Sequence, residues 1–117
     1  MNIEVKNQIA MLCEDTVLIT DGSSAMDLLA TVRYETGCSA LVLRKEQLSE
    51  EFFRLSSGLA GEVLQKFVNY QMRLVIVGDY SGYTSKPLKD FIYESNNGQD
   101  VFFVSTKDEA VSKLSAV

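Results

Sequence analysis

Histidine is absent from this chain of 117 residues. Its absence removes the side chain that most often transfers protons near neutral pH, and with it the His-containing metal sites and nucleophilic triads. Neither the phosphate-binding loop nor the dinucleotide-binding glycine fingerprint is present, because Gly58-Leu59-Ala60-Gly61 lacks the spacing of both. We therefore expect a binding protein that uses no metal and no cofactor, rather than an enzyme.

Cysteine is also scarce. Cys13 and Cys38 lie far apart without a zinc-ligand spacing, which favours buried free thiols in a reducing compartment. The first ten residues do not have the pattern of a secretion signal, and no apolar run approaches the length of a membrane span. These features predict a cytoplasmic protein that is not inserted in a membrane.

Positive charge is in the minority. Sixteen acidic residues against eleven basic ones give a formal net charge of −5, and no local cluster of Lys or Arg reverses it. Such a surface repels phosphates, so nucleic acid and anionic lipid are not expected as partners. With 46% hydrophobic residues, the chain is long enough to form one domain over residues 1–117 around its own core.

The hydrophobic pattern predicts an α/β fold. A weakly alternating start over 3–13 is typical of an antiparallel hairpin with one solvated face. A helix follows with a capping box of Ser24 and Asp27 and ends at Gly37. Short apolar runs then predict three buried strands, at 39–43, 73–78 and 101–104. Between and after them, helices are expected from Ser57, from Pro87 and from Thr106.

This order, ββαβαβαβα, requires right-handed crossovers between parallel strands. The sequence therefore predicts a mixed, mostly parallel β-sheet covered by four helices. A polar connection is expected over residues 44–51.

The candidate site begins where a hydroxyl pair and a glycine, Ser56-Ser57-Gly58, open an amphipathic helix. Either serine has a structural interpretation as the helix N-cap, which supplies about 1 kcal/mol. A polar strip continues down the same helix, and it is either a recognition surface or an ordinary solvated face. The strip consists of Glu62, Gln65, Lys66 and Asn69.

A second candidate position is Asp79, which follows a buried strand at the carboxyl edge of the sheet, where open parallel sheets bind ligands. The same carboxylate has an alternative role as a cap of the next loop. Tyr80 and Tyr83 in that loop either stack on a ligand or pack onto the domain.

The order of elements resembles the STAS domain of sulfate transporters and bacterial anti-sigma-factor antagonists. Those antagonists carry an Asp-Ser-Ser/Thr-Gly-Leu-Gly helix start, and the corresponding run here is Leu55-Ser56-Ser57-Gly58-Leu59-Ala60-Gly61, in which Leu55 replaces the acidic residue. The resemblance implies that Ser56 is the phosphorylated position. A phosphate there would add roughly two negative charges that release or re-dock a partner.

Over almost its whole length the chain is similar to a bacterial family known as domain of unknown function 4180. The similarity is carried by the runs Phe52-Phe53, Ser57-Gly58-Leu59-Ala60-Gly61-Glu62, Gln65-Lys66-Phe67-Val68-Asn69-Tyr70, Ile76-Val77-Gly78-Asp79 and Phe91-Ile92-Tyr93-Glu94-Ser95-Asn96. This family implies no particular activity.

These features predict a cytoplasmic protein-interaction or regulatory module that recognises a protein partner through Ser56-Ser57-Gly58 and the polar strip. A homodimer through an exposed sheet edge or helix face is compatible with this function. The alternative is a small-ligand or nucleotide-binding domain that uses Gly58 and the loop 79–84. A concave pocket joining those two segments would favour the alternative. A third hypothesis is a minor enzyme that depends on Glu62 or Lys66.

Overall fold

Within residues 2–115, five strands form one sheet whose spatial order follows the chain, from β1 at one edge to β5 at the other. The computed structural model describes residues 2–115. In it, β1 and β2 are antiparallel, and β3, β4 and β5 run parallel to β2. The strands are β1 (Ile3–Lys6), β2 (Ile9–Leu12), β3 (Ala40–Arg44), β4 (Arg73–Val77) and β5 (Val101–Val104). The predicted mixed, mostly parallel sheet is therefore confirmed.

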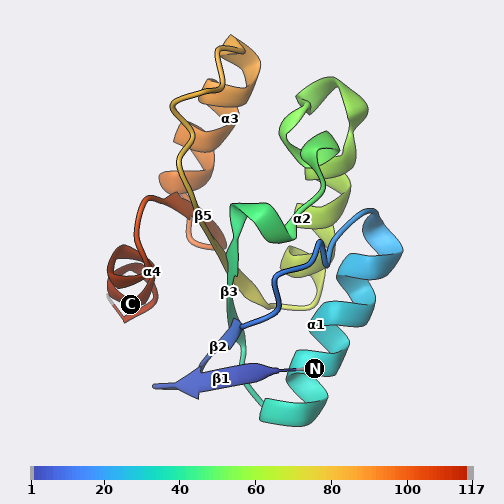
Figure 1. Cartoon of the computed structure of the whole chain (residues 1–117), viewed down its shortest axis with the longest axis vertical. Coiled ribbons are helices and arrows are strands. Elements are labelled where there is room, and N and C mark those ends of the chain that lie inside the picture. Colours follow the sequence, from blue (N-terminus) through green and yellow to red (C-terminus); the bar gives the residue numbers. More distant parts are fainter. Residues whose placement is uncertain (1, 116–117) are drawn as a thin grey trace.

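In the described part of the chain, four α-helices cover the two faces of this sheet unequally. They are α1 (Gly22–Thr36), α2 (Leu59–Asn69), α3 (Lys86–Asn96) and α4 (Lys107–Ser115). Because each parallel strand lies next to the previous one, right-handed crossovers place α1, α2 and α3 on the same face. The larger core cluster lies there and includes Leu29, Phe67 and Leu88, whereas Ala110 and Leu114 of α4 pack on the opposite face. Figure 1 shows α1 and α2 on one side of the sheet and α4 on the other.

The inner strands are apolar throughout because both faces of the sheet are covered. In β3, Leu41 and Leu43 pack into the larger cluster, while Ala40 and Val42 pack into the cluster below α4. Side chains alternate between the faces along a strand, so each inner strand needs apolar residues at every position.

The N-terminal hairpin turns through Asn7 and Gln8, both with positive φ, at 54° and 65°. This is the backbone that two-residue hairpin turns require. The expected solvated face is wrong for β2, all of whose residues are buried because β2 lies between β1 and β3. Cys38 is buried as predicted, but Cys13 is exposed because it follows the last buried residue of β2.

The cap of α1 lies three residues earlier than the sequence indicated. Asp21 is the N-cap, and its carboxylate accepts a hydrogen bond from Ser24 N–H at 2.7 Å. The Ser24 hydroxyl accepts from Asp21 N–H at 3.1 Å, so Ser24 closes the capping box that was predicted to pair it with Asp27. Gly37 ends the helix with φ 70°, as predicted.

The connection from β3 to α2 contains three short 3-10 helices instead of an irregular polar segment. These are η1 (Lys45–Gln47), η2 (Glu50–Phe53) and η3 (Leu55–Ser57). Phe52 and Phe53 are buried and anchor η2 to the core. Gly58 then takes a left-handed conformation with φ 79°, which ends η3 and makes α2 begin at Leu59. The helix therefore begins just after the serine pair and not at it.

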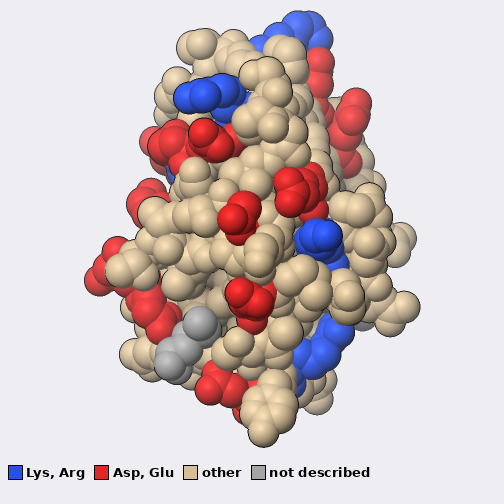
Figure 2. Space-filling model, turned by 90° about the vertical axis from the view of Figure 1, so that its right-hand side faces the viewer, with Lys and Arg blue, Asp and Glu red and all other residues tan. Residues whose placement is uncertain are grey.

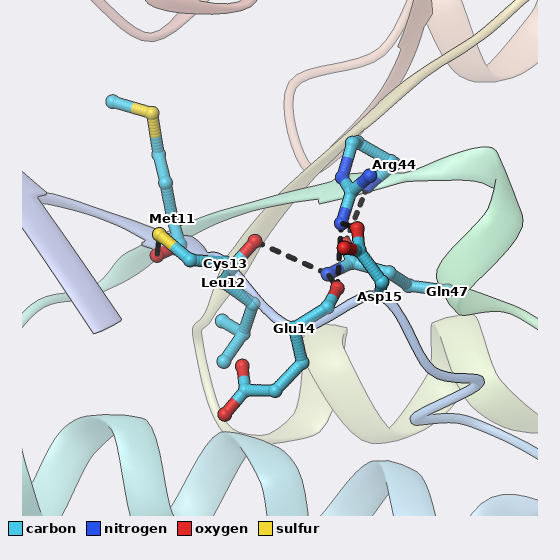
Figure 3. A network of polar contacts seen from close by, with 7 residues as sticks. All are labelled: Met11, Leu12, Cys13, Glu14, Asp15, Arg44 and Gln47. Atoms are coloured by element: carbon cyan, nitrogen blue, oxygen red, sulfur yellow. Dashed lines mark hydrogen bonds and ion pairs between the residues drawn. The ribbon is translucent and has the colours of Figure 1, made fainter. Parts of the chain in front are cut away.

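Gln47 is a buried polar residue that fixes the start of this connection. Its side chain is 1% exposed, and its Nε2 donates to Leu12 O at 3.1 Å and to Glu14 O at 2.7 Å. Its Oε1 accepts from Arg44 N–H at 2.8 Å. Figure 3 shows this amide between the ends of two strands, with the Arg44 guanidinium on Asp15 beside it. The network ties the segment after β2 to the end of β3.

On the side formed by α1 and α2, the charged side chains of the described residues carry both signs and are interspersed. Figure 2 shows acidic side chains spread over this side, with basic side chains between them. Within residues 2–115, the helices are too short or too polar to cross a membrane.

Candidate functional site

A groove of about 600 Å³ lies between η2, η3 and the start of α3. It is at the carboxyl edge of the sheet, where the chain leaves β3 and β4 and where open α/β sheets bind ligands. The lining residues are Glu50, Phe53, Arg54, Leu55, Ser56, Tyr83, Ser85 and Pro87. We call this surface the Tyr83 groove.

Two aromatic rings form the wall of the Tyr83 groove. The rings of Phe53 and Tyr83 stack with their centroids 5.2 Å apart and an interplanar angle of 15°. Tyr80 lies behind them, 6.3 Å from Phe53 and 5.7 Å from the core ring of Phe103. The wall is therefore held by the core, although Tyr83 itself comes from a loop.

A lysine, a tyrosine and a glutamate cluster at the edge of this wall. The Lys45 ammonium lies 4.6 Å from the centre of the Tyr83 ring, and it donates a hydrogen bond to Asp79 O at 3.3 Å. The Tyr83 hydroxyl donates to the Glu50 carboxylate, 3.3 Å from Oε2. This cluster connects the end of β3, the loop after β4 and η2.

Lys45 is cationic and Tyr83 is neutral at neutral pH. Contact with Tyr83 raises the pKa of the Lys45 ammonium, so this side chain remains protonated. Burial raises the pKa of the Tyr83 phenol, against the opposing effect of the Lys45 charge. Lys45 thus supplies a fixed positive charge, which suits binding an anion better than accepting a proton.

Gly78 makes room for the lysine. A Cβ atom at this position would lie 2.6 Å from the Cβ of Lys45 and 3.1 Å from its Cδ. Only a residue without a side chain allows the Lys45 stem to lie across the end of β4.

Glu50, Arg54, Ser56 and Ser85 supply most of the polar part of the lining. Ser85 is the N-cap of α3 and accepts from Leu88 N–H at 3.4 Å. Arg54 and Ser56 are exposed on either side of the half-buried Leu55. The Tyr83 groove therefore combines an apolar wall with a guanidinium, a carboxylate and hydroxyl groups, which is the composition of a binding site.

Of the predicted helix start, only Ser56 lines the groove. The Ser57 hydroxyl donates to Glu51 O at 2.8 Å and accepts from Leu59 N–H at 3.2 Å. Ser57 thus caps the first amide of α2. The N-cap residue itself is Gly58, the next residue in the chain. Ser57 and Gly58 shape the chain beside the groove.

None of the four residues of the polar strip lines the Tyr83 groove. The Glu62 carboxylate packs against Gly22 at the start of α1. It occupies the space that a side chain at position 22 would need. Gln65 donates to the Asn69 side chain at 2.8 Å, and Lys66 is half-buried.

Asp79 stands beside the groove, joined to it through Lys45. Its carboxylate accepts a hydrogen bond from Ser81 N–H at 2.9 Å, and bonding to Ser81 lowers the pKa of Asp79. This geometry is the loop cap that the sequence offered as the alternative role.

Lys45, Glu50 and Arg54 of this site were not singled out from the sequence. Lys45 had a usable signal, because it is a lysine directly after a buried strand at the carboxyl edge of a parallel sheet. The others lie in the 3-10 segment, whose short turns leave no periodic pattern to read. Over residues 2–115, no group of three potential metal ligands lies together.

A family model described as Domain of unknown function (DUF4180) matches residues 4–114. The chain belongs to this family. The DUF4180 match includes every residue that lines the Tyr83 groove, as well as the loop that carries Asp79. No curated protein and no solved structure matches the chain.

Proposed function

We propose that the protein is an interaction module that binds a short extended segment of a partner protein in the Tyr83 groove. The observation that supports this function is the groove itself, in which the stacked rings of Phe53 and Tyr83 lie beside Arg54. Rigid aromatic side chains and arginine contribute most of the free energy at protein interfaces.

The chemistry of the groove defines the segment that fits it. The aromatic wall suits an apolar or proline side chain, as in other aromatic-lined peptide grooves. Arg54 lines the groove and Lys45 lies at its edge, so the segment is expected to carry a carboxylate next to its apolar anchor. Glu50 accepts a bond from Tyr83, which reduces its repulsion of such an acid.

Regulation through Ser56 is part of this proposal. Ser56 is exposed and lines the groove together with Arg54, so a phosphate on it would place about two negative charges among the binding groups. The S56D variant should lose an acidic partner. S39D is the matched control, because Ser39 is also exposed but precedes β3, at the opposite edge of the sheet.

Selection from a library of random peptides displayed on phage tests the binding function. The immobilised protein should enrich peptides with an acidic residue beside an apolar one, and R54A should bind them at least about tenfold more weakly. K89A is the control, because Lys89 is an exposed cation outside the groove lining. Enriched peptides that bind R54A and wild type equally would contradict the assignment of the groove.

The second candidate is binding of a small ligand or nucleotide. It is favoured by the concave shape, since the groove joins Ser56 to the loop of Tyr83 and its volume of about 600 Å³ is typical of ligand sites. A thermal shift screen with nucleotides and small carboxylates distinguishes the two functions. Stabilisation that disappears in R54A, without any peptide enrichment, would replace the first function by the second.

The fold and setting complete the proposal. We infer a STAS-like module of a bacterial cytoplasm, and the sequential order of the parallel strands supports the fold. The two free cysteines support a reducing compartment. The dispersed acidic surface supports a protein partner over nucleic acid.

A further inference from the structure

The edge strand β1 has backbone groups that point away from the sheet. Cys13 N–H donates to Asn2 O at 3.0 Å, which extends the register in which Ile3 lies opposite Leu12. Residues of an antiparallel ladder alternate between bonded and non-bonded pairs. The backbone groups of Glu4 and Lys6 therefore bond to β2, like those of Asn2. The N–H and C=O groups of Ile3 and Val5 face away from β2.

The side chains on this edge form a charged pair around an apolar residue. Val5 is 49% exposed, and the flanking Glu4 and Lys6 are exposed as well. Glu4 lies opposite Met11 on the face of the sheet that α4 covers, and Lys6 shares that face because it is two residues further on.

We propose that β1 pairs with β1 of a second copy of this chain, antiparallel and centred on Val5. Val5 has its N–H and C=O on the free edge, so the two Val5 residues exchange both hydrogen bonds across a twofold axis. Glu4 of each copy then lies opposite Lys6 of the other, in a non-bonded pair whose side chains approach closely.

The order of charges along β1 indicates that its partner strand comes from a second copy of the chain. A twofold interface places the same surface on both sides, so it must be self-complementary. The sequence Glu4-Val5-Lys6 meets this condition, because reversing its direction places an acid opposite a base at both ends. Edge strands that avoid pairing commonly carry proline or charged side chains. Ile3–Lys6 contains no proline, and its two charges are of opposite sign, so they attract in the antiparallel pairing.

Sedimentation equilibrium of the whole chain tests this dimer. Wild type should dimerise with a dissociation constant below about 1 mM. E4K and K6E should each weaken dimerisation about tenfold, because each places like charges opposite one another, and the double variant E4K/K6E should restore the wild-type constant. E4K reduces the net negative charge and K6E increases it, so weakening in both variants excludes a general charge effect.

V5P provides a second, independent variant. Proline at position 5 removes an N–H that does not bond to β2, so the hairpin keeps its ladder while edge pairing is lost. Circular dichroism checks that V5P is folded. In wild type, hydrogen exchange of the Val5 amide should be slower at concentrations where the protein is a dimer than at concentrations where it is a monomer. A wild type that stays monomeric up to about 1 mM, or a dimer unaffected by V5P and by E4K, overturns the proposal.

Discussion

The ammonium of Lys45 lies 4.6 Å from the centre of the Tyr83 ring, which joins the residue after β3 to the loop after β4. The Lys45 stem crosses the end of β4 at Gly78, where no side chain intervenes. This contact sets one end of the Tyr83 groove, and the stability of the groove can be tested at Gly78.

We expect Gly78→Ala to displace Lys45 and to lower the free energy of unfolding by about 1–2 kcal/mol, because the new methyl group overlaps the Lys45 Cβ. Urea denaturation measures the loss, and the NMR shift of the Lys45 side chain reports whether it leaves the Tyr83 ring. Gly82→Ala is the control, since a Cβ at Gly82 meets open space. An equal effect of both substitutions would contradict the contact.

Gln47→Leu should lower the free energy of unfolding by about 2–3 kcal/mol, because Arg44 N–H and Leu12 O lose the partner that the amide provides, whereas Glu14 O keeps the Arg44 guanidinium. Chemical denaturation of both variants is the measurement. Gln65→Leu makes the same chemical change at an exposed site and should stay within about 0.5 kcal/mol of wild type. A Gln47→Leu protein as stable as wild type would show that the network in Figure 3 does not support the fold.

The ionisation of Tyr80 should make the free energy of unfolding depend on pH in the alkaline range. Burial raises the pKa of its phenol above the ordinary value of 10.0, and the hydroxyl donates to Ile76 O at 2.7 Å. Above pH 10 the unfolded chain loses this proton first, so the stability that Tyr80 contributes below that pH is lost as the pH rises.

The free energy of unfolding should therefore fall less steeply between about pH 10 and about pH 12 in Tyr80→Phe than in wild type. At neutral pH the variant should be about 1 kcal/mol less stable, because it lacks the hydrogen bond. Tyr34→Phe is the control, since Tyr34 is 92% exposed. Parallel pH profiles for Tyr80→Phe and wild type would rule out this origin of the alkaline loss.

The hairpin turn offers a stabilising substitution. Gln8 has a φ of 65°, which costs free energy for any residue with a side chain, and Asn-Gly is the preferred sequence for such a turn. Gln8→Gly should therefore raise the free energy of unfolding by about 0.5–1 kcal/mol. Thermal and urea unfolding measure the change. A decrease would mean that the added freedom of the unfolded chain outweighs the relief in the turn.

The sequence predicts most of the sheet, because residues buried on both faces leave a continuous apolar run such as Leu41-Val42-Leu43. Gly37 likewise marks the end of α1 through its left-handed conformation. The capping residues in the sequence did not locate the helix starts as well. Both Asp21 and Ser24 have side chains that cap helices, and only tertiary packing decides which one is the N-cap.

The site is harder to predict than the sheet, because its residues come from segments without periodicity. Ser56 was identified, yet it lies in the 3-10 helix η3 and not in α2. The left-handed conformation of Gly58 separates these two helices. Phe53 and Tyr83 are thirty residues apart in sequence and meet only because β3 and β4 are neighbours. Such stacking depends on the order of the strands, which no local pattern contains.

Site-specific photo-crosslinking in cells that produce the protein tests the central claim most directly. A photoreactive amino acid at position 56 lies in the Tyr83 groove, and one at position 39 lies at the opposite edge of the sheet as a matched control. We expect a discrete protein adduct from position 56 that is absent from position 39 and reduced when Arg54→Ala is added. No adduct at position 56, or the same adducts from both positions, would contradict the groove as the site of recognition.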